Sequence, residues 1–306
     1  MPAMTFRQLE VFLAIVREGS FSRAGQRIHL SQPTLSEHVR ELERELGRPL
    51  FARRGRTVRL TEAGRVFEPY AARVLGEANA ARQAVAELDG LGRGSLLLGS
   101  STTPGVYLLP AVLAAFWRRW PGVEVTLRIA NSRAIEAQVR AGELDLGVVG
   151  GHGLAPGERC LAAGLLDELV LVVGRGHPWA RRRDVVPAAL GAERVLVREP
   201  GSATREVTER ALQRAGVRLG PTLQLDHTEA IKQAVLAGLG VAFVSRYAIR
   251  GDLASGRLAV VPVRGLRILR HFHVLQPEGR AAGAAVRAFI EVFETLGRAQ
   301  LRPQGR

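Results

Sequence analysis

The sequence predicts a small helical region that carries a helix-turn-helix, then a long helix, then an α/β domain built from two similar halves. Three observations lead to this fold class. Residues 1–90 contain few glycines and show, almost throughout, the apolar spacing of helices. Three glycines fall within residues 90–94, too many for the interior of a stable helix. Beyond them, short apolar runs alternate with helical stretches, as in βαβ units.

Length and composition exclude several classes of protein. The chain has 306 residues, enough for two domains. Its 46% hydrophobic and 24% charged residues are typical of globular proteins and exclude a disordered or collagen-like chain. Cys160 is the only cysteine, which excludes a disulfide framework and indicates a reducing compartment. The sequence has no long apolar run and no apolar signal core in residues 1–10, so we expect a cytoplasmic protein without a membrane partner.

The net charge of +14 suggests a polyanionic partner such as nucleic acid, or small anionic ligands. Its distribution does not decide between them. Residues 1–60 contain 11 arginines and 6 glutamates, whereas residues 91–306 contain 29 basic and 18 acidic residues. Most of the excess therefore lies outside the region in which we expect the helix-turn-helix.

The first 50 residues predict three helices. Residues 5–18 have apolar side chains at helical spacing, and a short helix follows from about Ser22. Ser31 is a good N-cap for the third helix, and Gly47 ends it. The expected buried stripe of the third helix is Leu35, Val39, Leu42 and Leu46. Its opposite face is polar, so the second and third helices fit a helix-turn-helix.

This polar face and the segment after it supply candidate DNA contacts. Residues 49–60 predict a two-stranded ribbon, or wing, with arginines at its turn. Arginine offers charge and forked donors to phosphates and guanine edges, and hydroxyl and amide groups can reach base edges. The candidate contacts to double-stranded DNA are Gln32, Pro33, Thr34, Ser36, Glu37, Arg40, Arg53, Arg54 and Arg56. The alternative is a solvated helical domain whose exposed arginines bind nothing.

A long helix is expected after the ribbon, from the N-cap Thr61 to about Asp89. Apolar side chains recur along it every three or four residues, at Phe67, Tyr70, Val74, Ala78, Ala81, Val85 and Leu88. The N-terminal region is too small to cover this apolar side, or seam, of the helix. Because such a seam usually pairs with a copy of itself, we expect a homodimer formed through this helix.

Residues 94–297 predict an α/β domain with a mostly parallel sheet. The expected strands are residues 96–100, 123–129, 144–149, 169–173, 194–197, 222–225, 241–244 and 271–275. The expected helices between or after them include residues 108–120, 134–141, 203–215, 229–237 and 281–297. Residues 94–165 and 166–268 form two similar halves, and the last strand and helix return to the first half.

Several runs of residues closely resemble the LysR-type transcriptional regulators. In the N-terminal region they are FRQLEVF (6–12), GSFSRA (19–24), LSQPTLS (30–36), LFAR (50–53) and LTEAG (60–64), with matching spacing and no gaps. Later matches are LLP (108–110), PGV (121–123), GELDL (142–146) and GLGV (238–241). Residues 198–205 and 228–235 look like a branch of that family that includes regulators of carbon fixation and sulfur assimilation.

The resemblance implies a fold and a mechanism. It implies an all-α winged helix-turn-helix (residues 1–60), a long linker and dimerisation helix (61–90) and an α/β effector domain (91–306). The effector domain would be two-lobed and periplasmic-binding-protein-like (type 2), with lobe I at 94–165 plus 269–306 and lobe II at 166–268. Such regulators are usually homotetramers on partly palindromic promoter DNA. A small effector would change tetramer geometry, DNA bending and recruitment of RNA polymerase.

The family also suggests roles for individual residues. Positions corresponding to Gln32, Pro33, Ser36 and Glu37 approach bases, and the one corresponding to Arg53 approaches phosphate. Position 37 varies within the family, so Glu37 leaves the preferred base open.

Hydroxyl and amide side chains lie where strands of the α/β domain end and helices begin. Ligands of open α/β sheets bind at such ends, and helix N-termini favour anions. We therefore expect a cleft between the halves that binds a small, anionic effector. Its candidate residues are Ser101, Thr102, Thr103, Asn131, Ser132, Ser202, Thr204, Arg205 and Thr228. Arg205 would add charge, and the alternative is that these residues are ordinary helix caps.

Other chemistry has weak support. The glycines of residues 90–94 follow a helix rather than a strand, which does not fit a dinucleotide-binding loop, so no cofactor is expected. His271 and His273 share a strand face without further ligands, so no metal site is expected. Asp226 and His227 lack a serine elbow, so we expect no catalytic residues and no enzyme. The alternative function is a small-molecule-binding protein or a transferase on the same α/β fold.

Overall fold

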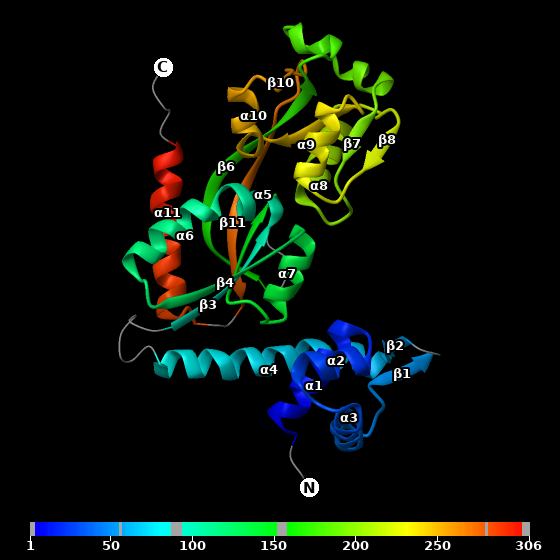
Figure 1. Ribbon diagram of the computed structural model, residues 1–306, viewed down its shortest axis with the longest axis vertical. Coiled ribbons are helices and arrows are strands. Elements are labelled where there is room, and N and C mark those ends of the chain that lie inside the picture. Colours follow the sequence, from blue (N-terminus) through cyan, green and yellow to red (C-terminus); the bar gives the residue numbers. More distant parts are fainter. Residues whose placement is uncertain (1–3, 55–56, 87–93, 152–157, 279–280, 302–306) are drawn as a thin grey trace. The chain divides into compact units, whose positions relative to one another are not determined.

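The computed structural model describes residues 4–54, 57–86, 94–151, 158–278 and 281–301 (Figure 1). The chain divides into two compact units. The N-terminal unit comprises Met1–Val85 with Arg140–Glu143, and the C-terminal unit comprises Ala86–Val139 with Leu144–Arg306. Each unit is described by itself.

The N-terminal unit contains the expected helices and ribbon. Its elements are α1 (Phe6–Glu18), α2 (Phe21–Ile28), α3 (Gln32–Leu46), β1 (Phe51–Arg54), β2 (Thr57–Leu60) and α4 (Glu62–Ala86). The side chains of Thr5, Ser20 and Ser31 accept hydrogen bonds from backbone N–H groups in the first turns of α1, α2 and α3. Each such N-cap contributes about 1 kcal/mol to helix stability, which explains why these short helices begin where they do.

Two apolar clusters hold the three helices and the ribbon together. One joins α1, α2 and α3 through Val11, Ile15, Ala24, Leu35 and Val39. The other joins α1 and α3 to the start of α4 and includes Leu9, Phe12, Leu42, Leu50 and Ala71. Leu46 does not belong to either cluster. Leu46 is exposed, so its prediction as part of the buried stripe was wrong: it is the last residue of α3, which ends at the left-handed Gly47.

The helix α4 begins as expected, because the Thr61 hydroxyl accepts a hydrogen bond from the Gly64 N–H at 3.0 Å. A Cβ on residue 64 would lie 2.2 Å from the carbonyl oxygen of Leu50, so this close approach requires glycine. The helix is observed as far as Ala86, and residues 87–89 lie outside the described residues. Phe67 belongs to the core of the unit rather than to an outer seam, since its ring lies 5.2 Å from that of Phe12.

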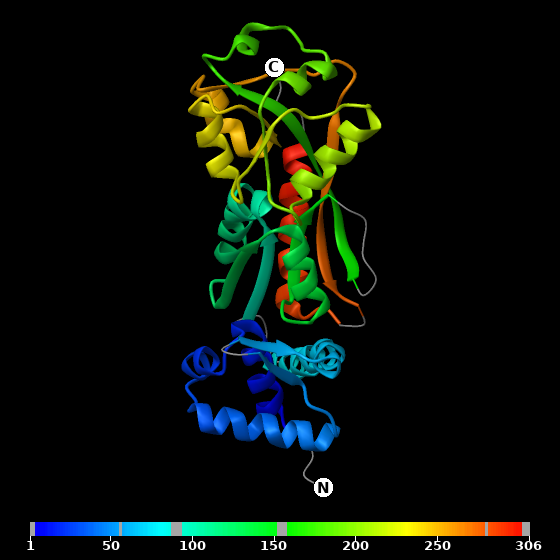
Figure 2. The ribbon, with the colours of Figure 1, turned by 90° about the vertical axis from the view of Figure 1, so that its right-hand side faces the viewer.

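The C-terminal unit is built on one nine-stranded sheet. Its strands are β3 (Gly94–Ser101), β4 (Val123–Ala130), β5 (Leu146–Gly150), β6 (Glu158–Gly174), β7 (Val195–Val197), β8 (Thr222–Gln224), β9 (Val241–Ser245), β10 (Leu258–Val260) and β11 (Ile268–Pro277). Their order is β4-β3-β5-β11-β6-β9-β7-β8, and β10 pairs with β6. In Figures 1 and 2, β6 (green) and β11 (orange) run through both halves of the unit.

The sheet is mixed, and the prediction of a mostly parallel sheet was wrong. The strands β4, β3 and β5 are parallel, as are β8, β7 and β9. The strands β6 and β11 are antiparallel to each other and to the parallel groups beside them. The apolar runs indicated where strands lie, but the direction of two strands that connect the halves depends on the path of the chain.

Helices cover both halves of the sheet. They are α5 (Thr102–Tyr107), α6 (Leu109–Arg119), α7 (Ser132–Arg140), α8 (Ala203–Arg214), α9 (Thr228–Leu236), α10 (Arg250–Ala254) and α11 (Ala284–Leu301), with 3-10 helices at Pro178–Arg181, Pro187–Ala192 and Arg246–Ile249. The core of the first half includes Phe116, Phe272 and Phe289. In the second half β6 and β9 are buried on both faces, because Leu171 and Phe243 belong to one cluster and Val172 and Val244 to another.

Two details bear on the sequence predictions. The short helix α5, which directly follows β3, was not predicted, although the polar residues at its start were. Among the described residues, no helix is long and apolar enough to cross a membrane.

Candidate functional site

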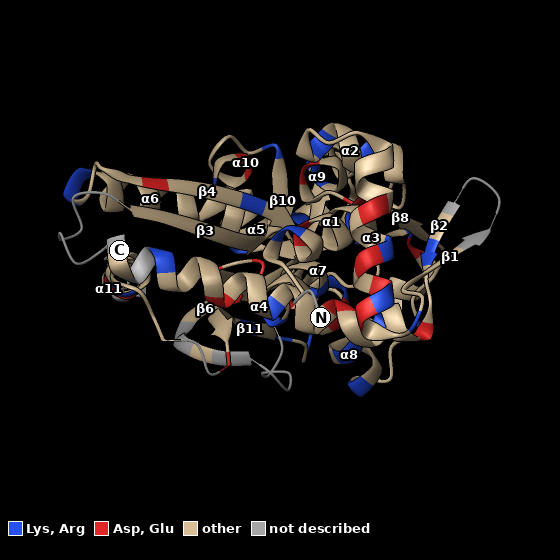
Figure 3. Ribbon diagram, turned by 90° about the horizontal axis from the view of Figure 1, so that it is seen from below, with Lys and Arg blue, Asp and Glu red and all other residues tan. Residues whose placement is uncertain are grey.

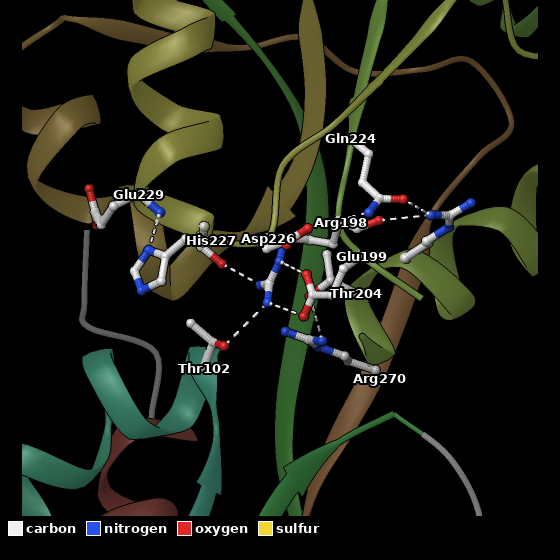
Figure 4. A network of polar contacts seen from close by, with 11 residues as sticks. Thr102, Arg198, Glu199, Thr204, Gln224, Asp226, His227, Glu229 and Arg270 are labelled. Carbon is white, nitrogen blue, oxygen red and sulfur yellow. Dashed lines mark hydrogen bonds and ion pairs between the residues drawn. The ribbon is translucent and has the colours of Figure 1, made fainter. Parts of the chain in front are cut away.

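Two buried arginines belong to a network of polar contacts in the C-terminal unit (Figure 4). Arg198 directly follows β7, and Arg270 lies on β11. Each is only 4% exposed. A buried guanidinium is costly unless its N–H groups are hydrogen-bonded and its charge is balanced. The partners of these two arginines therefore show how the unit is held together at this point.

Arg198 links the two lobes through hydroxyl groups. Its Nη1 donates to Thr228 Oγ1 at 2.8 Å, at the start of α9. Its Nη2 donates to Thr102 Oγ1 at 3.3 Å, at the start of α5. The same guanidinium is forked onto the carboxylate of Glu199, with Nε 2.7 Å from Oε2 and Nη2 2.9 Å from Oε1. Figure 4 shows Thr102 reaching Arg198 from the first lobe.

Arg270 makes a second bridge. Its Nε donates to Asp167 Oδ2 on the neighbouring strand β6 at 2.8 Å. Its Nη1 donates to Thr204 Oγ1 at 3.0 Å and its Nη2 to Thr103 Oγ1 at 3.1 Å. Burial lowers the pKa of Arg270, Asp167 opposes that shift, and the nearby Arg198 adds to it. The cation therefore depends on its buried carboxylate partner.

Four of the nine residues predicted to bind an effector converge on these two arginines: Thr102, Thr103, Thr204 and Thr228. Ser101 and Ser202 are buried N-cap residues of α5 and α8 whose side chains make no capping hydrogen bond. Their position at two helix N-termini, where N–H groups point outward, is suited to an anion. The ordinary capping role proposed as the alternative therefore does not account for these two hydroxyls.

Asn131 is an ordinary helix cap, as the alternative interpretation stated. Its Oδ1 accepts a hydrogen bond from Ala134 N at 3.0 Å and caps α7. Ser132 is buried at the first position of the same helix. The next residue connects this helix to the second lobe: Arg133 N donates to the Gly201 carbonyl at 3.1 Å, and the Arg133 guanidinium lies 3.1 Å from Glu206. The junction at residues 131–132 therefore lies beside the one at residues 201–206.

Arg205 is occupied within its own lobe. Its Nε pairs with Glu209 at 2.7 Å, and its Nη1 donates to the Arg198 carbonyl and to Gln224 Oε1, both at 3.0 Å. Its charge is therefore balanced by Glu209. The cations that bond to hydroxyl groups of both lobes are Arg198 and Arg270 instead.

A second polar group joins the lobes beside Arg198. The Tyr107 hydroxyl at the end of α5 donates to Glu229 Oε1 of α9. Lys232 Nζ donates to Glu229 at 2.9 Å and lies 2.8 Å from Asp252 of α10. Burial alone would raise the pKa of Glu229, but hydrogen bonds from Tyr107 and Lys232 outweigh it and lower that pKa. Burial and the bond to Glu229 raise the pKa of Tyr107.

The sequence carried signals for the residues that were missed. Arg198 follows the apolar run of β7 at the same strand end at which the hydroxyl residues were found. Arg270 shares the inward face of β11 with Ile268 and Phe272, and a charge at an inward position needs a buried partner. Glu229 and Lys232 are three residues apart on α9, a spacing at which a helix brings opposite charges together, but no sequence signal placed Tyr107 of α5 beside Glu229.

The described residues contain no cluster of three or more histidine, cysteine or acidic side chains able to hold a metal ion. Cys160 is half-buried, and its Sγ lies 4.0 Å from His273 Nδ1. His227 caps α9 by accepting a hydrogen bond from Glu229 N at 3.2 Å. His227 therefore has a structural role in the helix.

In the N-terminal unit, the helix α3 presents most of the predicted DNA contacts to solvent. Gln32, Pro33, Glu37 and Arg40 are exposed, and Thr34 and Ser36 are half-buried on the same helix. Arg40 Nε donates to the Ser36 carbonyl at 3.1 Å rather than to Glu37. Figure 3 shows both basic and acidic residues along α3, so its surface is mixed rather than uniformly positive.

The ribbon of β1 and β2 is antiparallel, with Arg53 opposite Val58 and Arg54 opposite Thr57. Arg56 lies outside the described residues. The ribbon follows α3 directly in the chain, in the order expected for a helix-turn-helix with a wing.

Both units match described protein families. Residues 6–65 match the bacterial regulatory helix-turn-helix protein family, lysR family. Residues 89–297 match the LysR substrate binding domain.

Individual relatives agree. A RuBisCO operon transcriptional regulator from Acidithiobacillus ferrooxidans is 34% identical over 290 residues, which cover 94% of this chain and 92% of the relative. A full-length OxyR variant from Pseudomonas aeruginosa has a similar structure, with a TM-score of 0.71, 26% identity and complete coverage of both chains. The regulatory domain of CcmR from Synechocystis PCC6803, in complex with 2-PG, has a TM-score of 0.62 and 27% identity, over 67% of this chain and 97% of that one.

The two family models together match the helix-turn-helix with its ribbon and the two-lobed α/β unit. This chain belongs to the LysR family of bacterial helix-turn-helix transcriptional regulators.

Proposed function

We propose that the C-terminal unit binds a small anionic metabolite between its two lobes, and that binding changes how the protein acts on promoter DNA. The observation that carries this proposal is the convergence of threonine hydroxyls from both lobes on two buried guanidinium groups, Arg198 and Arg270. Arginine recognises carboxylate and phosphate groups with its forked donors. A ligand that touches both lobes has a different affinity for the open and closed states, as a switch requires.

The proposed effector contacts are the predicted polar residues together with Arg198. Ser101, Thr102, Ser132, Ser202, Thr204 and Thr228 are buried at the starts of α5, α7, α8 and α9. Four helix N-termini at one place favour a negative charge. The ligand named for the CcmR regulatory domain, 2-PG, is the first probe for this site, and the names of the curated relatives favour promoters of carbon-fixation genes as targets.

For the DNA-binding part we propose that α3 enters the major groove with Gln32, Pro33, Thr34, Ser36, Glu37 and Arg40, and that Arg53, Arg54 and Arg56 contact phosphates. In the division proposed here, residues 1–60 bind DNA, 61–90 form the linker, and 91–306 sense the effector. Lobe I is residues 94–165 with 269–306, and lobe II is residues 166–268.

The long helix α4 is the proposed dimerisation element. Tyr70, Val74 and Val85 are exposed apolar side chains spaced along it, and Val66 is a further one. In water such a row favours pairing with a second copy. We further propose a homotetramer in the cytoplasm that acts on RNA polymerase recruitment and carries out no catalytic step of its own.

Thermal unfolding of the purified protein with 2-PG and with inorganic phosphate tests the effector site. An anion that binds the folded state raises the Tm. We expect Arg198→Gln, or Thr102→Val combined with Ser202→Ala, to remove this rise, and Arg210→Gln, at an exposed arginine of α8, to retain it. If all variants respond as the wild type does, the anion binds elsewhere.

A gel-shift assay with the DNA upstream of the protein's own gene tests the other half of the proposal. Sequence-preferring binding should appear at moderate salt and weaken steeply as salt increases, because phosphate contacts release counterions. Absence of any sequence preference would contradict the proposed role of α3.

A further inference from the structure

The side chain of Glu199 occupies the edge of Arg198 that an effector anion would use. Its two carboxylate oxygens accept from Nε and Nη2 at 2.7 and 2.9 Å. This forked arrangement is the one by which arginine binds carboxylates and phosphates in general. The side-chain contacts of Arg198 to Thr102 and Thr228 are made to neutral hydroxyl groups. The strongest interaction of this guanidinium is therefore with the adjacent residue of its own chain.

The buried cations of the inter-lobe network are each balanced by a carboxylate. Arg270 is paired with Asp167, Lys232 with Glu229 and Asp252, and Arg198 with Glu199. Each of these three positive charges is therefore already compensated. An anion that enters must either accept a carboxylate as a close neighbour, which is costly in a poorly hydrated site, or displace one.

Glu199 is the carboxylate whose departure frees Arg198 at least cost, since Glu229, although 41% exposed, pairs with Lys232 rather than with Arg198. Asp167 is fully buried between strands and also accepts from Ser245 Oγ at 2.7 Å, and Asp252 is 3% exposed and held by both Lys232 and Arg257. The Glu199 side chain is 14% exposed and belongs to the connection between β7 and α8. A carboxylate in that connection can rotate into water and regain its hydration, whereas Asp167 and Asp252 cannot.

We propose that Glu199 is an internal counter-ion that competes with the effector for Arg198. This inference rests on the proposed function, since it assumes an anion in this cleft. A tethered carboxylate acts at an effective concentration of the order of millimolar or more. Only a ligand whose oxyanion accepts the same two hydrogen bonds from Arg198 displaces the Glu199 carboxylate. Glu199 therefore excludes neutral molecules and sets the effector concentration at which the switch responds.

The test is Glu199→Gln, which keeps the shape of the side chain and removes its charge. We expect 2-PG and inorganic phosphate to bind this variant about tenfold more tightly than the wild type, as measured by isothermal titration calorimetry. The Tm without ligand should be lower, because Arg198 is left without a counter-ion, and the rise with ligand should be larger. Glu199→Asp keeps the charge but shortens the side chain by one methylene group, so we expect a smaller gain in anion affinity. This variant replaces the first one if Glu199→Gln does not fold.

The matched control is Asp184→Asn, which also removes one carboxylate charge from the partner of an arginine in the same lobe, the exposed Arg264. It separates competition at Arg198 from a general gain in positive charge, and we expect unchanged affinity. If wild-type protein binds the anions through Arg198 and Glu199→Gln binds no more tightly, or less tightly, the competition is refuted and Glu199 positions Arg198 instead. If neither anion binds the wild type or the variant, the proposed anion site fails, and the counter-ion role fails with it.

Discussion

Arginines are used differently in the two units of this protein. In the N-terminal unit, the arginine of α3 named as a DNA contact is exposed, and its guanidinium Nε bonds to the backbone of its own helix. In the C-terminal unit, Arg198 and Arg270 are buried, and each bonds to a carboxylate and to two threonine hydroxyl groups. Exposed arginines act through long-range attraction that salt screens, whereas buried ones act through geometry. The same side chain is therefore free to face solvent in one unit and fixes the packing of several segments in the other.

The largest expected effect comes from breaking the buried pair. Asp167→Asn leaves the Arg270 charge uncompensated and should lower the free energy of unfolding of the C-terminal unit by about 3–5 kcal/mol. Urea unfolding followed by tryptophan fluorescence measures this, because all three tryptophans lie in the C-terminal unit.

The neighbouring residue provides the control. Glu168 pairs with Arg246 and Arg267 near the surface. Burial raises the pKa of Glu168, but the two arginines outweigh burial and lower that pKa overall. Glu168→Gln should cost no more than about 1 kcal/mol. Equal costs at positions 167 and 168 would mean that burial does not separate the two kinds of ion pair.

A similar destabilisation is expected in the helix-turn-helix core. Leu35 of α3 is fully buried against α1 and α2, and Leu35→Ala should cost about 2–5 kcal/mol and abolish DNA binding through unfolding of the N-terminal unit. Leu46→Ala, at an exposed leucine of the same helix, should have almost no effect. Limited proteolysis of α1–α3 measures the loss of stability in each variant, and gel shifts measure DNA binding. Equal rates of cleavage in the two variants would contradict the expectation that only the buried leucine stabilises the unit.

A smaller effect is expected at the ribbon. Arg53→Ala combined with Arg54→Ala should weaken DNA binding about equally for all sequences and reduce the salt slope by about 2, because each arginine is proposed to neutralise one phosphate. Arg210→Ala combined with Arg214→Ala removes the same charge from exposed positions of α8 and should leave the slope unchanged. Fluorescence anisotropy at several salt concentrations distinguishes local contacts from net charge, and equal changes would favour net charge.

The smallest effect concerns pH. Glu229 has a lowered pKa, so its stabilising contribution is complete above the ordinary value of 4.5 and is lost as the pH falls through the lower folded value. For Lys232 burial lowers the pKa, but Asp252 and Glu229 raise it overall. Its contribution is complete below the ordinary 10.5 and is lost as the pH rises through the folded value.

Glu229→Gln should therefore flatten the acid side of the Tm profile below pH 4.5, since no proton is then taken up at this position. Tyr107→Phe removes one of the hydrogen bonds that lower this pKa and should move the acid destabilisation to higher pH. An unchanged profile in both variants would show that the contact between α5 and α9 does not contribute to stability.

The sequence predicted the helix-turn-helix well because its signals are local. Ser31 and Gly47 mark the ends of α3, and the period of Leu35, Val39 and Leu42 marks its buried face. In the C-terminal unit the apolar runs located most strands, and the polar residues at strand ends located Thr102, Thr103, Thr204 and Thr228. The same rule did not distinguish Asn131, which caps its helix, from Ser202, which does not.

The sequence by itself determined the order of the elements, the N-caps, the buried faces and the family. Only the tertiary structure decided that β6 and β11 are antiparallel, that Arg198 rather than Arg205 links the lobes, and that Glu199 occupies its fork. The physical reason is the range of the forces involved. Caps and periodicity depend on residues within one or two turns, whereas the hydroxyl partners of the buried arginines come from segments 30 to 167 residues apart that folding brings within hydrogen-bond distance.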